Sequence, residues 1–67
     1  MNESRPTVDP LGVYTVKRTC AELGICYKTL RKYRMNGYIQ PINPNNHYRL
    51  KYSGQSILAC WLKLRML

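Results

Sequence analysis

Acidic residues are scarce in this sequence, and they stop early. Glu3, Asp9 and Glu22 oppose 11 Lys and Arg among 67 residues, which gives a formal net charge of +8. From Leu23 to Leu67 the chain has eight Lys or Arg and no acid. A domain with this imbalance repels itself, so we expect a polyanion to be its usual neighbour. The composition favours nucleic acid, because phosphate contacts from Lys and Arg release counterions.

Two kinds of hydrophobic segment are also missing. The sequence has no run of about 18 apolar residues that would span a membrane, and its polar start lacks the basic-then-apolar order of a secretion signal. We therefore expect a cytoplasmic protein. The 67 residues leave room for one small domain with a thin core, because a chain of this size buries only about 60% of its unfolded surface.

Groups for catalysis and metal binding are few. Cys20, Cys26 and Cys60 form no C-x-x-C pair, and the single histidine, His47, has no partner at zinc-ligand spacing. We interpret the cysteines as reduced thiols, with Cys20 and Cys60 as small core side chains. No nucleophile, base and orienting group can be assembled from the sequence. We therefore expect no enzymatic activity, no metal site and no cofactor.

The first 12 residues, MNESRPTVDPLG, contain two prolines, one glycine and little apolar material. This composition predicts a flexible arm over residues 1–12 and a folded domain over residues 13–67. Arg5 can reach into a DNA minor groove from such an arm, although a tail without function fits the same residues.

Two short helices are predicted next. In YTVKRTCAELG, Thr15 can cap a helix start, apolar residues recur at helical spacing, and Gly24 is suited to a left-handed end. Only Ile25 and Cys26 separate this helix from YKTLRKYRMN, which Gly37 closes. Two short helices joined by a tight turn with glycine predict a helix-turn-helix.

The second helix has two distinct sides. At about 100° per residue, Leu30 and Tyr33 lie on one side, and Arg34 lies at the margin of that apolar stripe. Three basic residues fall on the opposite side: Lys28, Arg31 and Lys32. A solvated basic face alone is common on helices, but the acid-free context favours a surface that binds a polyanion.

The stretch YIQPINPNNHYRLKY predicts a β-hairpin, because β-favouring residues flank a segment dense in turn formers. Pro41 makes the first strand short or places it at an edge. In the second strand, alternation places Tyr48, Leu50 and Tyr52 on the inner face. Arg49 and Lys51 then form a basic outer face.

A last helix is predicted from Ser53, which can cap GQSILACWLKLRML. Its broad apolar side closes the core, with Trp61 as a core anchor. The order helix, turn, helix, hairpin, helix predicts an α+β fold, the small winged helix-turn-helix.

The residues also resemble a known family. TLRKYRMNGYIQP followed by HYRLKYS is similar to the DNA-binding half of MerR-type regulators, over about residues 14–64. The matching residues, in order, are Thr29, Leu30, Arg31, Tyr33, Gly37, Pro41, Tyr48, Arg49 and Ser53. Cys26 stands where the family has a Ser or Thr cap. MerR-type regulators continue into a long dimerisation helix, and this sequence ends where that helix is expected to begin. The nearer resemblance is therefore to the stand-alone branch, the excisionases or recombination directionality factors.

The resemblance implies a sequence-specific protein of double-stranded DNA that binds and bends attachment-site DNA and promotes integrase-mediated excision of a mobile element. It implies a nucleoid-associated, bacterial or phage-encoded protein, with an integrase and neighbouring copies of itself as further partners. A small MerR-like transcriptional regulator without an effector domain requires the same surface and stays an alternative. A protein-interaction adaptor with incidental charge, and an RNA-binding protein, are weaker alternatives.

The resemblance also implies which residues contact DNA. The recognition helix, in the major groove, supplies Tyr27, Lys28, Thr29, Arg31 and Lys32. The wing, at the minor groove or the DNA backbone, supplies Asn46, His47, Arg49 and Lys51. Candidate contacts to the DNA backbone are Lys17, Arg18 and Arg34. For Asn46, simple turn geometry is an alternative role.

Overall fold

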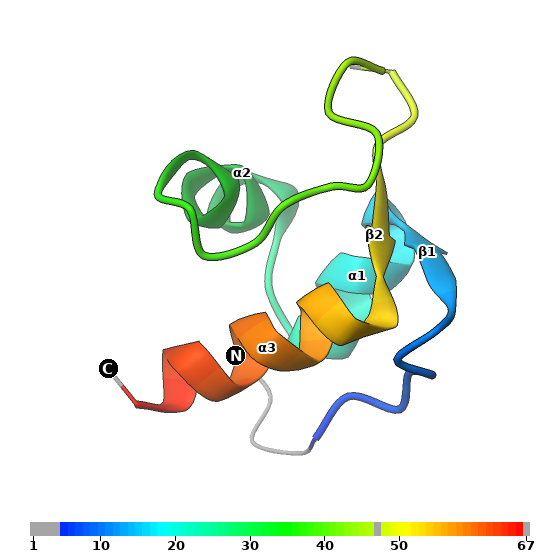
Figure 1. Cartoon of the computed structure of the whole chain (residues 1–67). Helices are drawn as coiled ribbons and strands as arrows, with labels where there is room; N and C mark the ends of the chain where they lie inside the picture. Colours follow the sequence, from blue (N-terminus) through cyan, green and yellow to red (C-terminus); the bar gives the residue numbers. More distant parts are fainter. Residues whose placement is uncertain (1–4, 47, 67) are drawn as a thin grey trace.

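The computed structural model describes residues 5–46 and 48–66 as a small α+β domain with three helices and a two-stranded antiparallel sheet (Figure 1). The elements are β1 (Val13–Thr15), α1 (Val16–Leu23), α2 (Tyr27–Met35), β2 (Lys51–Ser53) and α3 (Gly54–Arg65). The three predicted helices are confirmed, whereas the sheet is formed by different strands from those predicted.

The ends of α1 follow from its local sequence. Thr15 is the N-cap, and its Oγ1 accepts the Arg18 N–H at 3.1 Å. Gly24 takes the left-handed conformation with φ 67°, which glycine adopts without steric cost. The Ile25 N–H then donates to the Cys20 carbonyl at 3.0 Å, which satisfies one of the last helical acceptors. Both predicted caps of this helix are confirmed.

The second helix ends in the same way but begins differently. Gly37 has φ 79°, and the Tyr38 N–H donates to the Tyr33 carbonyl at 2.8 Å, with the two rings 5.9 Å apart. At the start, Cys26 has extended backbone but makes no side-chain bond to a helical N–H. Thus α2 has a well-closed end and a start without a side-chain cap.

The core lies where the three helices meet β2. Its buried apolar side chains are Leu23, Leu30, Ile39, Leu50, Tyr52, Ile57, Cys60 and Trp61. α2 contributes only Leu30 fully, and burial of one leucine stabilises the fold by about 1.5–3 kcal/mol. Trp61 is 8% exposed, which confirms it as a core side chain. Burial raises the pKa of the Cys60 thiol to about 11, as expected for an inert core cysteine.

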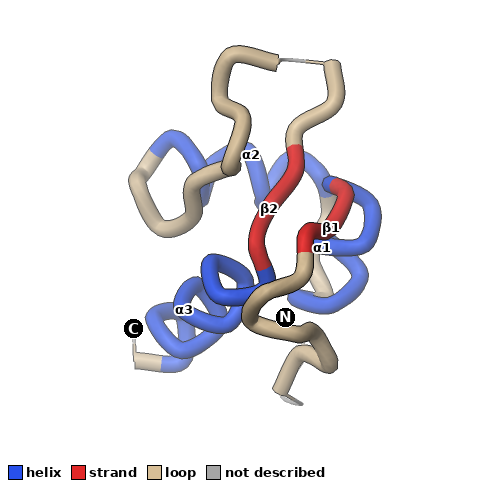
Figure 2. The backbone as a smooth tube through the Cα atoms, turned by 45° about the vertical axis from the view of Figure 1, so that its right-hand side comes forward, coloured by secondary structure: helices blue, strands red, loops and turns tan. Residues whose placement is uncertain are grey.

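The predicted hairpin over 38–52 is wrong. β2 pairs with β1, with Val13 opposite Ser53 and Thr15 opposite Lys51, and residues 38–42 form no strand (Figure 2). One backbone bond runs from the Ile42 N–H to the carbonyl of Lys51, the first residue of β2, at 2.9 Å. It joins the two ends of the segment between these residues, which we call the 42–51 loop. The Asn43 side chain takes the place of further strand pairing.

Asn43 uses both ends of its amide in this loop. Its Oδ1 accepts the Lys51 N–H at 2.8 Å, and its Nδ2 donates to the Arg49 carbonyl at 2.8 Å. The Asn46 N–H also donates to the Asn43 carbonyl at 3.0 Å, which closes a turn around Pro44. Because a side chain satisfies the backbone groups that a second strand would bond, the loop needs no hairpin partner.

The predicted inward position of Tyr48 is also wrong, because its side chain is 98% exposed. The Arg49 N–H donates to Asn46 Oδ1 at 3.2 Å, so the chain still turns at Tyr48. The strand alternation therefore starts only at Leu50 and Tyr52, which are both buried as predicted.

The N-terminal segment differs from the predicted free arm over its described part. Pro6 is buried, and Val8 packs against the core. The Gly54 N–H donates to the Gly12 carbonyl at 2.9 Å, and a Cβ at Gly54 would overlap the Asp9 carbonyl. Composition suggested mobility, but residues 6–12 pack against α1 and the start of α3.

Candidate nucleic-acid interface

The outer side of α2 carries three exposed basic side chains, Lys28, Arg31 and Lys32. On the opposite side, Leu30 is 1% exposed and fixes the helix to the core. The predicted division of this helix into two sides is therefore confirmed. We call these three residues the α2 basic face. In the described part of the chain, no ion pair involves any of them.

Two further residues of the predicted recognition helix lie at its start. Tyr27 is 54% exposed, so its ring is accessible beside Lys28. Thr29 is half-buried, and its Oγ1 lies 3.3 Å from the Cys26 Sγ. The hydrogen bond with Thr29 lowers the pKa of the Cys26 thiol. Thr29 therefore has a local bonding role at the helix start.

Arg34 lies off the α2 basic face, as its marginal position in the helical period predicted. It is half-buried and close to the Tyr52 hydroxyl. Burial raises the pKa of Tyr52 above its ordinary value of 10, and the charge of Arg34 opposes that rise. Arg34 thus has an interaction within the fold.

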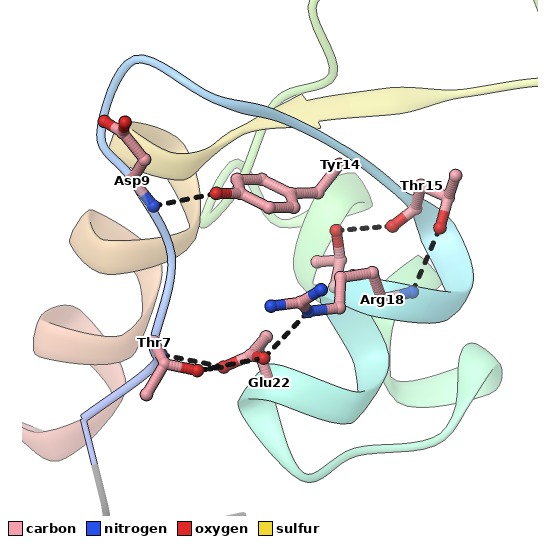
Figure 3. A network of polar contacts seen from close by, with 7 residues as sticks. Thr7, Asp9, Tyr14, Thr15, Arg18 and Glu22 are labelled. Carbon is pink, nitrogen blue, oxygen red and sulfur yellow. Dashed lines mark hydrogen bonds and ion pairs between the residues drawn. The ribbon is translucent and has the colours of Figure 1, made fainter.

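Arg18 is occupied within the fold as well (Figure 3). Its Nε donates to Glu22 Oε2 at 2.8 Å, and its guanidinium lies 5.4 Å from the centre of the Tyr14 ring. Glu22 also accepts the Thr7 N–H at 2.8 Å. This backbone bond is the main reason that the pKa of Glu22 is lowered, and the bond from Arg18 adds to it. The positive charge of Arg18 is therefore compensated by a neighbouring acid.

Figure 3 also shows how Asp9 and Tyr14 fasten the same segment. The Asp9 N–H donates to the Tyr14 hydroxyl at 2.8 Å, and Asp9 Oδ1 accepts the Leu11 N–H at 2.9 Å. Both described acids, Asp9 and Glu22, thus serve to hold residues 7–11 in place.

Lys17 has a different setting from its neighbour Arg18. It lines an open hollow of about 360 Å³ between the start of α1 and the 42–51 loop. The other lining residues that matter for its chemistry are Thr15, Tyr48, Arg49, Leu50 and Lys51. We call this the α1–loop hollow. Among the described residues that line it, three have basic side chains and none has an acidic one.

The remaining predicted wing residues are divided between this hollow and the loop turn. Arg49 is exposed and Lys51 is half-buried, and both line the hollow. Asn46 is exposed and accepts the Arg49 N–H through its side chain, which is the predicted turn role. His47 lies outside the described residues.

The α1–loop hollow was not predicted from the sequence, because Lys17 and Arg49 belong to elements that lie far apart along the chain. The two residues meet because β1 and β2 pair, which brings Thr15 opposite Lys51. The sequence feature that indicates β1 is the β-favouring stretch VYT, which ends at Thr15, the N-cap of α1. A strand of three residues gives too little alternation to be recognised by period.

Other site types find little support among residues 5–46 and 48–66. No three His, Cys, Asp or Glu side chains gather there in a way that could hold a metal ion. None of the helices in that part has the length and apolar character needed to cross a membrane. Comparisons with protein-family models, curated proteins and solved structures find no match to this chain.

Proposed function

We propose that this chain is a winged helix-turn-helix domain that binds double-stranded DNA, with α2 in the major groove and the 42–51 loop as the wing. The observation that carries the proposal is the α2 basic face: three exposed cations on a short helix whose other side is anchored by Leu30. No described acid pairs with these cations. Phosphates supply the compensating charge in this proposal.

The geometry of α2 suits a groove-reading role. An α-helix fits the major groove of B-form DNA, and Lys and Arg reach both the phosphates and the acceptor edge of guanine. Arg31, near the middle of the helix, is the residue that we assign to bidentate contact with a guanine or a phosphate. Tyr27, exposed at the start of the helix, is placed to contact a thymine methyl group or a phosphate.

The biological role that we propose for this binding is excision of a mobile element, as implied by the resemblance to excisionases. One domain of this kind buries only about 600–1,000 Å² on DNA, so useful specificity requires several copies on neighbouring sites. Bending of the DNA by such an array would assist an integrase. Regulation of transcription would require the same α2 basic face. The two roles are distinguished by deleting the gene and measuring whether excision of the element or transcription from a promoter changes.

The test measures binding of the full chain to a pool of random-sequence duplexes over a range of salt concentrations. With about five to seven phosphate contacts, the logarithm of affinity should fall with the logarithm of salt with a slope of about −5 to −6. An adaptor with incidental charge would show no strong salt dependence. Failure to bind any duplex at low salt would overturn the proposal.

A matched pair of variants locates the surface. Arg31→Gln and Lys63→Gln each remove one charge from an exposed basic side chain. Lys63 lies on α3, outside both the α2 basic face and the 42–51 loop. We expect Arg31→Gln to weaken binding about 10-fold or more and to change the selected sequence, and Lys63→Gln to leave the selected sequence as in the wild type.

A further inference from the structure

The turn between α1 and α2 brings two thiols together. Cys20 lies in the last turn of α1, and Cys26 directly precedes α2. The Ile25 N–H donates to the Cys20 carbonyl at 3.0 Å, so the backbone next to Cys26 is held against the end of α1. Burial is the main cause that raises the pKa of the Cys20 thiol, and the charge of Cys26 raises it further. The two sulfurs therefore lie within electrostatic range of each other.

The two thiols differ in access and in acidity. Cys26 is exposed, and its Sγ lies 3.3 Å from the Thr29 Oγ1. The hydrogen bond with this hydroxyl lowers the pKa of the Cys26 thiol, and the backbone N–H groups of Thr29 and Lys28 lower it further. Cys20 is half-buried and packs against the core. Because the thiolate is the nucleophile, Cys26 is the thiol that meets an oxidant first, and Cys20 stands behind it.

The third cysteine provides an internal reference. Cys60 lies on α3 with 0% of its surface exposed, and burial raises the pKa of its thiol to about 11. A shielded, protonated thiol reacts slowly with oxidants. Oxidation of the folded chain should therefore distinguish Cys20 and Cys26 from Cys60.

We propose that Cys20 and Cys26 form a reversible disulfide when the chain meets a peroxide. The Cys26 thiolate attacks one peroxide oxygen, so an S–O bond forms, the O–O bond breaks, and the leaving oxygen takes up a proton to give water. Cys20 sulfur then attacks the Cys26 sulfur, so the S–S bond forms, the S–O bond breaks, and a second water leaves with the Cys20 proton. The two thiols lose two electrons and two protons in total, and hydrogen peroxide gains them.

The first step prepares the second. Conversion of the Cys26 thiolate to a neutral sulfenic acid removes the charge that helps to raise the pKa of Cys20. The Cys20 thiolate then forms more readily and attacks the adjacent sulfur.

The disulfide changes the start of α2. It moves the Cys26 sulfur from Thr29 towards Cys20, so the first turn of α2 loses its contact between Sγ and Oγ1. Tyr27 and Lys28 follow Cys26 directly and are displaced with it. This consequence rests on the proposed DNA binding: the oxidised chain presents α2 in a changed position and binds duplexes more weakly.

The chemical test maps the disulfide in the full chain without DNA. The reduced wild type is treated with hydrogen peroxide, and the remaining thiols are alkylated with iodoacetamide in urea. Trypsin then releases residues 19–28, which carry Cys20 and Cys26, and residues 52–63, which carry Cys60. We expect the first peptide to carry no alkyl group and to be lighter by two hydrogen atoms, and the second to stay alkylated.

Other products of this reaction would overturn the inference. These are alkylation of both Cys20 and Cys26, a disulfide to Cys60 or to a second copy, and a sulfinic acid at Cys26 without a disulfide. Cys20→Ala removes the second thiol and should leave a sulfenic acid at Cys26, which dimedone traps. Urea denaturation checks that this variant is folded, and mapping of the wild type decides the question without it.

A separate measurement tests the consequence for DNA. Duplex affinity is measured for the reduced, oxidised and re-reduced wild type, and we expect oxidation to weaken it about 10-fold. Peroxide also oxidises the exposed Met35, but dithiothreitol does not reduce methionine sulfoxide, so recovery with dithiothreitol assigns the loss to the disulfide. Cys20→Ala should keep wild-type affinity and should not show the recoverable loss.

The two measurements fail separately. A mapped disulfide without a change in affinity would overturn the regulation of α2. If the reduced wild type binds no duplex, the proposed function and its regulation fail, whereas the peptide map still decides whether Cys20 and Cys26 form a disulfide.

Discussion

α1 and α2 are neighbouring helices of similar length, but their surroundings differ. α1 packs against α2, α3 and both strands, and the N-terminal segment bonds to its last turn through Thr7 and Glu22. α2 packs mainly against α1 and buries one side chain fully, Leu30. α1 is therefore an internal support of the fold, and α2 is presented at its periphery.

The arginines on the two helices show what this difference means for function. Arg18 on α1 has an acid at 2.8 Å and an aromatic ring beneath it, whereas Arg31 on α2 is exposed and has no ion-pair partner within the described chain. The net charge of the chain does not show which of these two arginines is available to bind a ligand. The positions of the acids distinguish them, because Glu22 lies on α1 itself and Asp9 lies on the segment that packs against α1.

The largest expected effect comes from loosening the segment that encloses α1. A Cβ at Gly54 would overlap the backbone of Asp9, so Gly54→Ala must displace residues 9–10 from α3. We expect a loss of about 3 kcal/mol in the free energy of unfolding, at the upper end for overpacking. Urea denaturation gives this value.

Gly37→Ala is the matched control for that change. No atom of the described residues lies within 4 Å of a Cβ at Gly37, but its φ of 79° strains an alanine, and we expect a loss of about 1 kcal/mol. Equal losses for the two variants would show that the packing of the N-terminal segment adds nothing to the stability of the fold.

Removing one arginine charge from each helix in turn tests whether α2 binds DNA while α1 supports the fold. We expect Arg31→Gln to weaken duplex binding about 10-fold with little change in stability, because its side chain is exposed. Arg18→Gln should have the opposite profile, with affinity within about 2-fold and a lower free energy of unfolding, because Glu22 loses a hydrogen bond. Fluorescence anisotropy and urea denaturation measure the two quantities. Equal losses of affinity would remove the distinction between the helices.

Substitutions at the first residues of α1 and α2 should change the free energy of unfolding by smaller amounts and in opposite directions. Thr15→Ala removes the side-chain cap of α1 and should destabilise the domain by about 1 kcal/mol. Cys26→Ser places a stronger acceptor at the uncapped start of α2 and should stabilise it by about 0.5–1 kcal/mol. Thermal unfolding of both variants checks the signs. A destabilising Cys26→Ser would mean that the contact between Cys26 and Thr29 already fulfils the capping role.

The smallest expected effect is a pH dependence of the free energy of unfolding, which arises from Glu22 on α1. The pKa of Glu22 is lowered from 4.5 in the folded chain, so its contribution to stability is fully present above that pH and is lost as pH falls through the lowered value. We expect Glu22→Gln to be less stable than the wild type at pH 7, and the difference to shrink below about pH 4.5. Thermal unfolding at several pH values measures it. A difference that persists at low pH would show that the carboxylate charge contributes nothing.

The sequence predicted the parts of the fold that local chemistry determines. Thr15, Gly24, Gly37 and Ser53 each act on their own few neighbours, so the starts and ends of the helices could be inferred without tertiary information. The division of α2 into two sides followed from its period in the same way. These features need no knowledge of which distant segment packs where.

The errors arose where one side chain or one distant segment decides the outcome. Asn43 replaces a strand, which no alternation pattern reveals. β1 has only three residues and becomes a strand because β2 lies beside it. The N-terminal segment looks unstructured by composition, but Glu22 and the bare Cα of Gly54 give it a place to pack. For the candidate site, the α2 basic face was predictable, and the α1–loop hollow was not.

The pairing of β1 with β2 also bears on how the domain reaches its folded state. Thr15 and Lys51 meet across more than half of the chain, so their pairing closes a long loop, whereas α1 and α2 make contacts between near neighbours. Loop closure costs entropy that local helix contacts do not, so we expect the helices to form before the sheet. The α2 basic face would then appear early in folding. The α1–loop hollow would be assembled only when the last long-range contact is made.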